Sequence, residues 1–234
     1  MPWVRHIFVC VADKFVASSF DFDKSIKVVK ESAFIPKKYL PIVWNSNVPE
    51  SWIWRIKELS EHFIYMCDDM YIGKPASRAD FFTHDNDPIL RIYLGPPNYP
   101  AKTNSTIPYV QMWSNAVAKY DLQYTRIQHQ ALPYRKSTMK KFYKQFKAQV
   151  DAASENKVRA GAKDFNLLRF TSSLAVMSGD SMLRVTHDDY DFFTESNEYE
   201  RIKRIPRLKP HFFCINNNFL SNKRVYKMLE KYYN

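Results

Sequence analysis

The chain is poor in the residues that build disulfide and zinc sites. Its 234 residues include three cysteines, Cys10, Cys67 and Cys214, and no CxxC pair. This wide spacing excludes the ligand pattern of zinc fingers. Because each cysteine lies in an apolar run, where it behaves as a small hydrophobic residue, we expect a reducing compartment, the cytoplasm. No apolar run reaches the roughly 20 residues of a membrane-spanning helix, so we expect neither a span nor a secretory signal.

Glycine is scarce as well, which limits how the chain can bind phosphate. The chain has four glycines and no glycine-rich loop of the kind that cradles a phosphate. Residues 95–108 contain four prolines and predict a loop. Residues 187–209 change from acidic and aromatic to basic, which predicts a charged surface connection. We expect residues 1–234 to form one domain, since no internal repeat or long linker divides them.

Basic residues are in excess, with 35 Lys and Arg against 24 Asp and Glu and a net charge of +11. This excess favours a polyanionic partner, such as nucleic acid, an anionic membrane surface or a phosphorylated substrate, or it reflects a generally basic surface. No nucleic-acid-binding module is recognisable, so we expect no nucleic acid partner. Five lysines predict the solvated face of an amphipathic helix: Lys136, Lys140, Lys141, Lys144 and Lys147. Alternatively, this face could attract a polyanionic acceptor or allow peripheral association with the inner membrane surface.

Three short runs of β-branched and aromatic residues, each ending in Asp or Asn, predict buried strands. They are residues 6–13, 62–70 and 211–218. Continuous apolar runs of this length are typical of strands covered on both faces. Helical spacing of apolar residues predicts helices at 50–62, 136–150 and 221–233. Strands that alternate with helices indicate an α/β fold. The apolar stripes of these helices are Trp52, Ile56 and Leu59; Met139, Phe142, Phe146 and Val150; and Val225, Met228 and Tyr232.

Oxygen-bearing side chains close the three predicted strands. They are Asp13, Asp68, Asp69, Asn216 and Asn217. If the strands are neighbours in one parallel sheet, these groups converge at its carboxyl edge, where α/β proteins bind ligands. Hard oxygen ligands suit Mg²⁺ or Mn²⁺ bound to substrate phosphates. The alternative is structural, because Asp after a strand often forms a turn or caps the next helix.

Longer motifs around the acid pair resemble the second block of the Stealth family. The stretches are "IPKKYLPIVWNSNVPESW" (35–52) and "ELSEHFIYMCDDMYIGKPASRADFF" (58–82). The opening "PWVRHIFVCVAD" is similar to the start of that block. Residues 129–137 with 156–165 resemble the third block, and 211–219 the fourth. Four ordered matches that span most of the chain are far more specific than any one of them.

The resemblance implies a fold and a reaction. The family's catalytic domain has a glycosyltransferase-A-like α/β core, a mixed sheet flanked by helices. Its members, which include capsular polysaccharide phosphotransferases, transfer a sugar 1-phosphate from a UDP-sugar such as UDP-N-acetylglucosamine to a glycan hydroxyl. UMP is released with the help of a divalent metal, Mg²⁺ or Mn²⁺. We therefore expect an enzyme whose partners are a UDP-sugar donor and a glycan or polysaccharide acceptor.

The resemblance also implies roles for particular residues. Asp68, Asp69 and Asn217 would hold the metal, with Asp69 the preferred ligand. His129 would act as the general base on the acceptor hydroxyl, a role that suits an imidazole. Without the resemblance, His129 reads as a polar loop residue.

Four more residues match family positions. Arg159 would contact the migrating phosphate through its planar guanidinium. Asp164 would position Arg159 or the acceptor. Asn45 and Ser46 would lie close to the donor sugar or phosphate, although they could equally form a turn.

The chain also departs from the family pattern. The family's first block, a Tyr-Trp-Val-Asp-Gly stretch on the first strand of the core, does not occur in it. Asn217 stands where the family usually has Asp, and Cys67 where it usually has Asn. We expect a core without its first strand, either because the chain is a fragment, because another polypeptide supplies the strand, or because the member is divergent. The alternative function is an inactive relative that binds carbohydrate or nucleotide-sugar.

Overall fold

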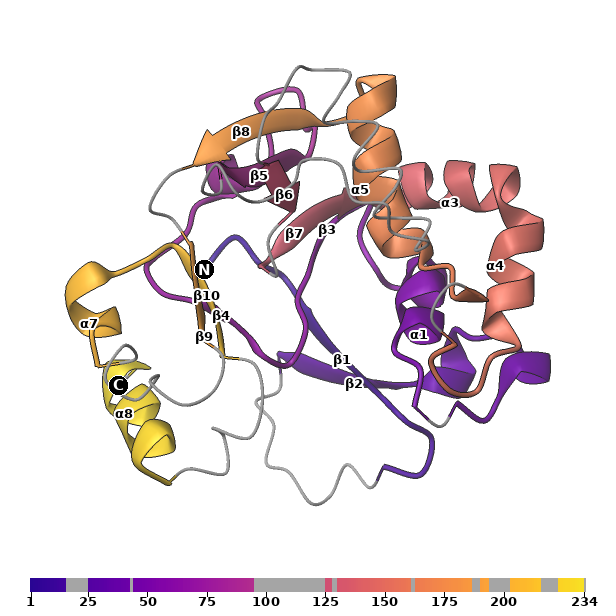
Figure 1. The fold of residues 1–234 in the computed structure, drawn as a ribbon, viewed down its shortest axis with the longest axis horizontal. Helices are drawn as coiled ribbons and strands as arrows, with labels where there is room; N and C mark the ends of the chain where they lie inside the picture. Colours follow the sequence, from indigo (N-terminus) through magenta and orange to yellow (C-terminus); the bar gives the residue numbers. More distant parts are fainter. Residues whose placement is uncertain are drawn as a thin grey trace. The chain divides into compact units, whose positions relative to one another are not determined.

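The computed structural model describes residues 1–15, 25–42, 44–94, 125–127, 130–160, 163–186, 190–193, 203–215 and 223–233. These residues form a mixed α/β structure of small sheets and helices (Figure 1), as the sequence predicts. They divide into two compact units. Unit 1 contains the described residues of 1–63 and 134–181, and unit 2 those of 64–94, 125–133 and 182–233. The single catalytic domain stays a prediction.

In unit 1, two parallel strands, β1 (Ile7–Val11) and β2 (Ile26–Lys30), pair from Ile7 opposite Ile26 to Val11 opposite Lys30. The prediction of a strand at 6–13 is confirmed, but its burial on both faces is wrong. Ile7 and Cys10 are exposed and the strand's other residues are half-buried, because β1 pairs with β2 alone among the described strands. Short 3₁₀ turns follow at Glu31–Ala33 and Lys37–Tyr39.

The three predicted runs contribute strands to three separate sheets, but the end of the second run meets the third, since Met70 pairs with Cys214. Besides the β1–β2 pair, β3 (His62–Tyr65) pairs with β7 (Leu132–Arg135), and β10 (Phe212–Ile215) belongs to a third sheet. The reason is a tight turn after β3, in which the Met70 N–H donates to the Cys67 carbonyl at 3.3 Å. The turn leads directly into a further strand, β4 (Met70–Ile72), which pairs with β10 instead.

In unit 2, strand β10 is the central strand of a three-stranded sheet and is buried along its whole length. It runs antiparallel to β4 and parallel to β9 (Tyr190–Phe193). Phe213 stacks on Tyr71 of β4, with ring centroids 5.0 Å apart. Helix α8 (Lys223–Tyr233) contributes Leu229 to the same core, together with Ile205 of the short helix α7 (Ile205–Leu208). This confirms the predicted C-terminal helix; Tyr232 of its predicted stripe is half-buried.

Another sheet of unit 2 has the strand order β6–β5–β8. Its strands are β5 (Ile89–Leu94), β6 (Thr125–Ile127) and β8 (Met182–Thr186). A 3₁₀ turn at Arg78–Asp80 precedes β5. The connection predicted at 187–209 is partly wrong, since it contains β9 and α7. The proline-rich stretch 95–108 lies outside the described residues.

The helix predicted at 50–62 is shorter than expected and begins earlier. Helix α1 spans Asn47–Trp52, continues as a 3₁₀ turn at Ile53–Arg55, and gives way to extended backbone at Ile56. Lys136 lies against the segment after this end, since its ammonium donates to the carbonyls of Ile56 at 2.9 Å and Leu59 at 3.3 Å. These bonds satisfy carbonyls that a longer helix would have used. They also remove Lys136, which is half-buried, from the predicted solvated lysine face.

The helix predicted at 136–150 is two helices that meet at Phe146. Helix α3 spans Lys136–Gln145 and α4 spans Lys147–Ser154. The buried stripe is confirmed for Met139, Phe142 and Val150. Phe146 adopts φ −112° and ψ 27°, which breaks the helix and turns its half-buried ring towards Phe165 and Phe170, at 5.9 and 5.4 Å. Among the described residues, no helix is both long and apolar enough to cross a membrane.

A mostly buried helix, α5 (Leu167–Ser178), was missed at the sequence level. Asn166 caps its start by accepting the Arg169 N–H at 3.0 Å, and Gly179 ends it at φ 78°. An Asn before an apolar run and a Gly after it are the usual boundary signals of a helix. Both signals are present in this sequence, and they mark the bounds of α5.

Gly73 allows β4 to approach the backbone before β10. A Cβ atom at this position would lie 2.3 Å from the Pro210 carbonyl oxygen. Because that atom belongs to the backbone, we expect Gly73→Ala to lower the free energy of unfolding by about 1–3 kcal/mol, the usual cost of overpacking. Chemical denaturation measures this, and an unchanged midpoint would contradict the close approach.

Candidate functional site

Unit 1 holds Arg159 next to Ser46, although the two lie 113 residues apart in the sequence. The Arg159 Nη2 donates to Ser46 Oγ at 2.7 Å. The backbones are joined as well, since the Arg159 N–H donates to the Trp44 carbonyl at 3.2 Å and the Trp44 N–H to the Lys157 carbonyl at 3.0 Å. Arg159 is exposed, so its guanidinium lies at the surface. A guanidinium has five N–H donors, and the bond to Ser46 uses one of them.

Beneath this pair, Asn45 and Asp164 form a buried hydrogen-bonded support. Asn45 Nδ2 donates to the Asn156 carbonyl at 2.9 Å and to Asp164 Oδ1 at 3.4 Å. Asp164 Oδ2 accepts the N–H of Ala160, the residue after Arg159, at 2.8 Å. Asp164 therefore holds the backbone that carries Arg159.

The structure thus brings four of the predicted site residues together in unit 1: Asn45, Ser46, Arg159 and Asp164. The cluster has an exposed cationic fork, a hydroxyl that orients it and a buried carboxylate below. A guanidinium held in one orientation suits two-point binding of a phosphate or a carboxylate.

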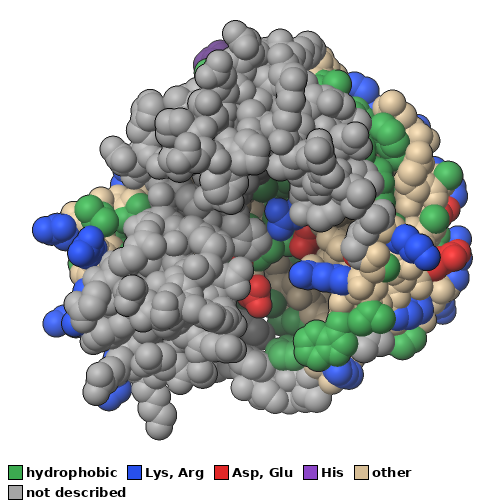
Figure 2. Space-filling view, viewed as in Figure 1, with side chains coloured by type: hydrophobic (Ala, Val, Ile, Leu, Met, Phe, Trp, Pro, Cys, Tyr) green, Lys and Arg blue, Asp and Glu red, His purple; other side chains and the backbone are tan. Residues whose placement is uncertain are grey.

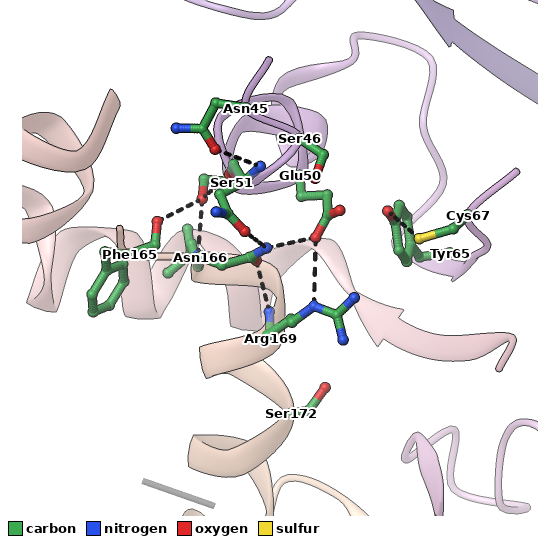
Figure 3. A network of polar contacts seen from close by, with 12 residues as sticks. Asn45, Ser46, Glu50, Ser51, Tyr65, Cys67, Phe165, Asn166, Arg169 and Ser172 are labelled. Carbon is green, nitrogen blue, oxygen red and sulfur yellow. Dashed lines mark hydrogen bonds and ion pairs between the residues drawn. The ribbon is translucent and has the colours of Figure 1, made fainter. Parts of the chain in front are cut away.

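A second polar network lies at the start of α5 and was not predicted (Figure 3). Its centre is Glu50 of α1, whose exposed fraction is 6%. The Asn166 side-chain amide donates to Glu50 Oε2, and Arg169 Nε lies 3.8 Å from the same oxygen. The same amide donates to Asn47 Oδ1 at 2.9 Å, and the Ser51 hydroxyl accepts the first N–H of α5 at 2.9 Å. A buried carboxylate with these partners ties α1 to α5, and with it the segment that carries Asn45 and Ser46.

The acid pair lies in unit 2, in the turn between β3 and β4. Asp68 is exposed and Asp69 is half-buried. The Asp69 carbonyl accepts the Ile215 N–H at 2.9 Å, so the acid pair lies beside the end of β10. Burial raises the pKa of Tyr71, and the negative charges of Asp69 and Asp68 raise it further.

Two adjacent carboxylates fit a hard divalent cation that takes its other ligands from water and phosphate. Within the described ranges, no group of three or more His, Cys, Asp or Glu residues is placed to hold a metal. Asn216, Asn217 and His129, the other candidates, lie outside the described residues. Asp13 Oδ1 accepts hydrogen bonds from the hydroxyl and the N–H of Ser32. These are contacts of a structural residue, the alternative to a metal ligand.

Unit 2 also contains an ion cluster of the buried Arg91 with the half-buried Asp80 and His211, which sequence analysis missed. The guanidinium of the buried Arg91 donates to Asp80 Oδ1 at 3.1 Å and to the Asp80 carbonyl at 3.0 Å, and His211 Nε2 lies 3.6 Å from Asp80 Oδ1. Burial alone would raise the pKa of Asp80, but hydrogen bonds from Ser77 and the charges of His211 and Arg91 together lower it. The "DFF" motif thus has a structural role, because Phe81 packs edge-on against Phe212 of β10.

Comparison with known proteins identifies the family. The model of conserved region 2 of Stealth proteins (Stealth CR2) matches residues 1–90. The chain is 30% identical to the capsular polysaccharide phosphotransferase fcs1 of Haemophilus influenzae, over 97% of this chain and 65% of that protein. It is also 30% identical to the capsular polysaccharide phosphotransferase LcbA of Neisseria meningitidis, over 97% of this chain and 64% of that protein. It is 26% identical to the exopolysaccharide phosphotransferase CpsY of Mycobacterium tuberculosis, over 99% of this chain and 46% of that protein.

The chain therefore spans less than two thirds of the length of these curated relatives. The similarity nevertheless extends along nearly all of this chain, and it includes the region that carries the acid pair and the Asn-Ser pair. The chain belongs to the Stealth family.

Proposed function

We propose that this chain transfers a sugar 1-phosphate from a UDP-sugar to a hydroxyl of a glycan or polysaccharide acceptor. The acceptor oxygen attacks the phosphorus that carries the sugar and forms the new phosphodiester bond. The pyrophosphate bond breaks, UMP leaves with the bridging oxygen, and the hydroxyl proton passes to a base. Similarity to capsular and exopolysaccharide phosphotransferases supports this reaction class.

The observation that carries the proposal is the arginine site of unit 1. Arg159, Ser46, Asn45 and Asp164 come from two distant segments, and direct contacts join them into one cluster. An exposed guanidinium that is held from below suits the charge of a migrating phosphoryl group, because such catalysis depends on positioning and charge neutralisation.

The remaining roles belong to the same proposal. Asp68 and Asp69 would bind Mg²⁺ or Mn²⁺, which would supply charge neutralisation at the diphosphate. His129 would accept the proton of the acceptor hydroxyl. The glycosyltransferase-A-like arrangement is part of the proposal too, and the mixed α/β structure supports it. Lys and Arg side chains are scattered over the described part of the surface in Figure 2, in keeping with a phosphorylated substrate.

Arg159→Lys tests the proposal. With UDP-N-acetylglucosamine, Mn²⁺ and a glycan acceptor, we expect UMP release by this variant to fall about tenfold to a hundredfold. Lysine keeps the charge but loses the planar fork that donates to Ser46 and would donate to phosphate. Release of UMP is followed by chromatography.

Arg207→Lys is the matched control, since Arg207 is an exposed arginine of unit 2 with no part in the site. It should keep full activity. The wild-type chain could release no UMP from any donor, while UDP-N-acetylglucosamine still raises its melting temperature. In that case a binding protein is the better description. Equal rates for Arg159→Lys and the wild type would remove Arg159 from the mechanism.

A further inference from the structure

An exposed indole stands directly beside the arginine site. Trp44 immediately precedes Asn45 and is 78% exposed, and its bridge partner Val158 immediately precedes Arg159 and is 55% exposed. Single exposed apolar side chains are common on protein surfaces and need no explanation. Here two of them lie side by side, next to a cation.

The backbone holds this pair in place. The Trp44 N–H donates to Lys157 and its carbonyl accepts from Arg159, so both sides of the residue are bonded to the strand-like segment 157–159. A ligand that lies on the indole therefore has little backbone to order, which lowers the entropic cost of binding.

We propose that Trp44 and Val158 form the platform for a pyranose ring whose phosphate is bound by Arg159. This inference rests on the proposed function and adds a sugar subsite to it. The apolar face of a pyranose fits an indole, while the phosphate fits a guanidinium that Ser46 orients. The platform, one indole and one valine, is far smaller than the roughly 800 Å² per partner that a stable protein interface buries. A single sugar ring matches its size.

Two substrates present this chemistry, the sugar 1-phosphate part of the donor and a phosphorylated sugar of the acceptor chain. Calorimetry on the full chain distinguishes them with five probes: N-acetylglucosamine 1-phosphate, UDP-N-acetylglucosamine, a phosphodiester-linked disaccharide, UMP and inorganic phosphate. The variants are Trp44→Ala, Trp44→Phe and the control Leu208→Ala, which removes an apolar side chain that is 54% exposed in unit 2.

We expect Trp44→Ala to weaken binding of N-acetylglucosamine 1-phosphate about fivefold to tenfold and to leave inorganic phosphate unchanged. Trp44→Phe should restore most of the affinity, because it keeps an aromatic face. Leu208→Ala should bind as the wild type does. A parallel loss for UDP-N-acetylglucosamine assigns the platform to the donor, and a loss confined to the disaccharide assigns it to the acceptor.

The proposal is overturned if Trp44→Ala binds all sugar phosphates as the wild type does, or if the wild type binds none of them. It is also overturned if UMP loses as much affinity as the sugar phosphates, since the indole would then stack on the uracil base. Release of UMP is measured separately on the wild type. Trp44-dependent sugar binding without UMP release contradicts the proposed reaction and leaves the subsite in place.

Discussion

Asp69→Asn is expected to lower metal-dependent release of UMP about 100- to 1000-fold, the cost of losing one preorganised electrostatic group. The variant loses a negative charge, and its amide is a poorer ligand for a hard cation. The fold should persist, because the hydrogen bond that ties this position to β10 comes from the backbone carbonyl of residue 69 and not from its side chain. The rate is measured against Mn²⁺ concentration, and direct Mn²⁺ binding is measured by electron paramagnetic resonance.

Asp85→Asn is the matched control. Asp85 is an aspartate of the same unit whose side chain is almost fully exposed, and its ion-pair partner is the exposed His84. This variant should retain the wild-type rate and the wild-type Mn²⁺ affinity. If Asp69→Asn keeps full metal-dependent activity, Asp69 is not a ligand, and a loss in Asp68→Asn alone would move the role to Asp68.

Glu50→Ala should lower the free energy of unfolding by about 3 kcal/mol. Without the carboxylate, the buried Asn166 amide and the half-buried Arg169 each lose one partner. In a protein of this size, each 1 kcal/mol corresponds to about 2–4 °C, so the melting temperature should fall by about 6–12 °C. Differential scanning calorimetry measures the change.

Two further variants separate the network from general effects of losing a glutamate. Glu50→Gln keeps an acceptor oxygen for Asn166 and should cost about 1 kcal/mol, the usual net value of one hydrogen bond. Glu155→Ala removes an exposed glutamate at the end of α4 and should change stability by less than about 0.5 kcal/mol. Equal melting temperatures for Glu50→Ala and Glu155→Ala would mean that the buried network does not stabilise unit 1.

Local patterns in the sequence predicted which segments become strands and helices. The apolar runs at 6–13, 62–70 and 211–218 each contain a strand, and the stripe of Met139, Phe142 and Val150 is buried. These features depend on neighbours within a few residues, and short-range periodicity records such neighbours. Ordered motifs likewise identified the family.

Some errors arose where a distant residue contributes to local structure, whereas the missed helix α5 has local boundary signals. The Ile56 carbonyl, within the predicted helix 50–62, accepts a bond from Lys136, 80 residues away. The three predicted strands pair in different sheets, because strand pairing depends on the turn after β3 and on the partners it brings together. The sequence predicted Glu50 only as part of a helix start. Its buried network was missed because its partners Asn166 and Arg169 lie 116 or more residues further along the chain.

The sequence by itself determined the α/β composition, the acid pair after a strand and the membership of the Stealth family. Only the tertiary structure decided that Arg159 lies on Ser46, that Asp164 is bonded to Asn45 beside them, and that Trp44 stays exposed. The physical reason is that the contacts of Arg159 with Ser46 and of Asp164 with Asn45 join segments 113 and 119 residues apart. No local pattern records which side chain will meet a hydrogen-bond donor at that separation.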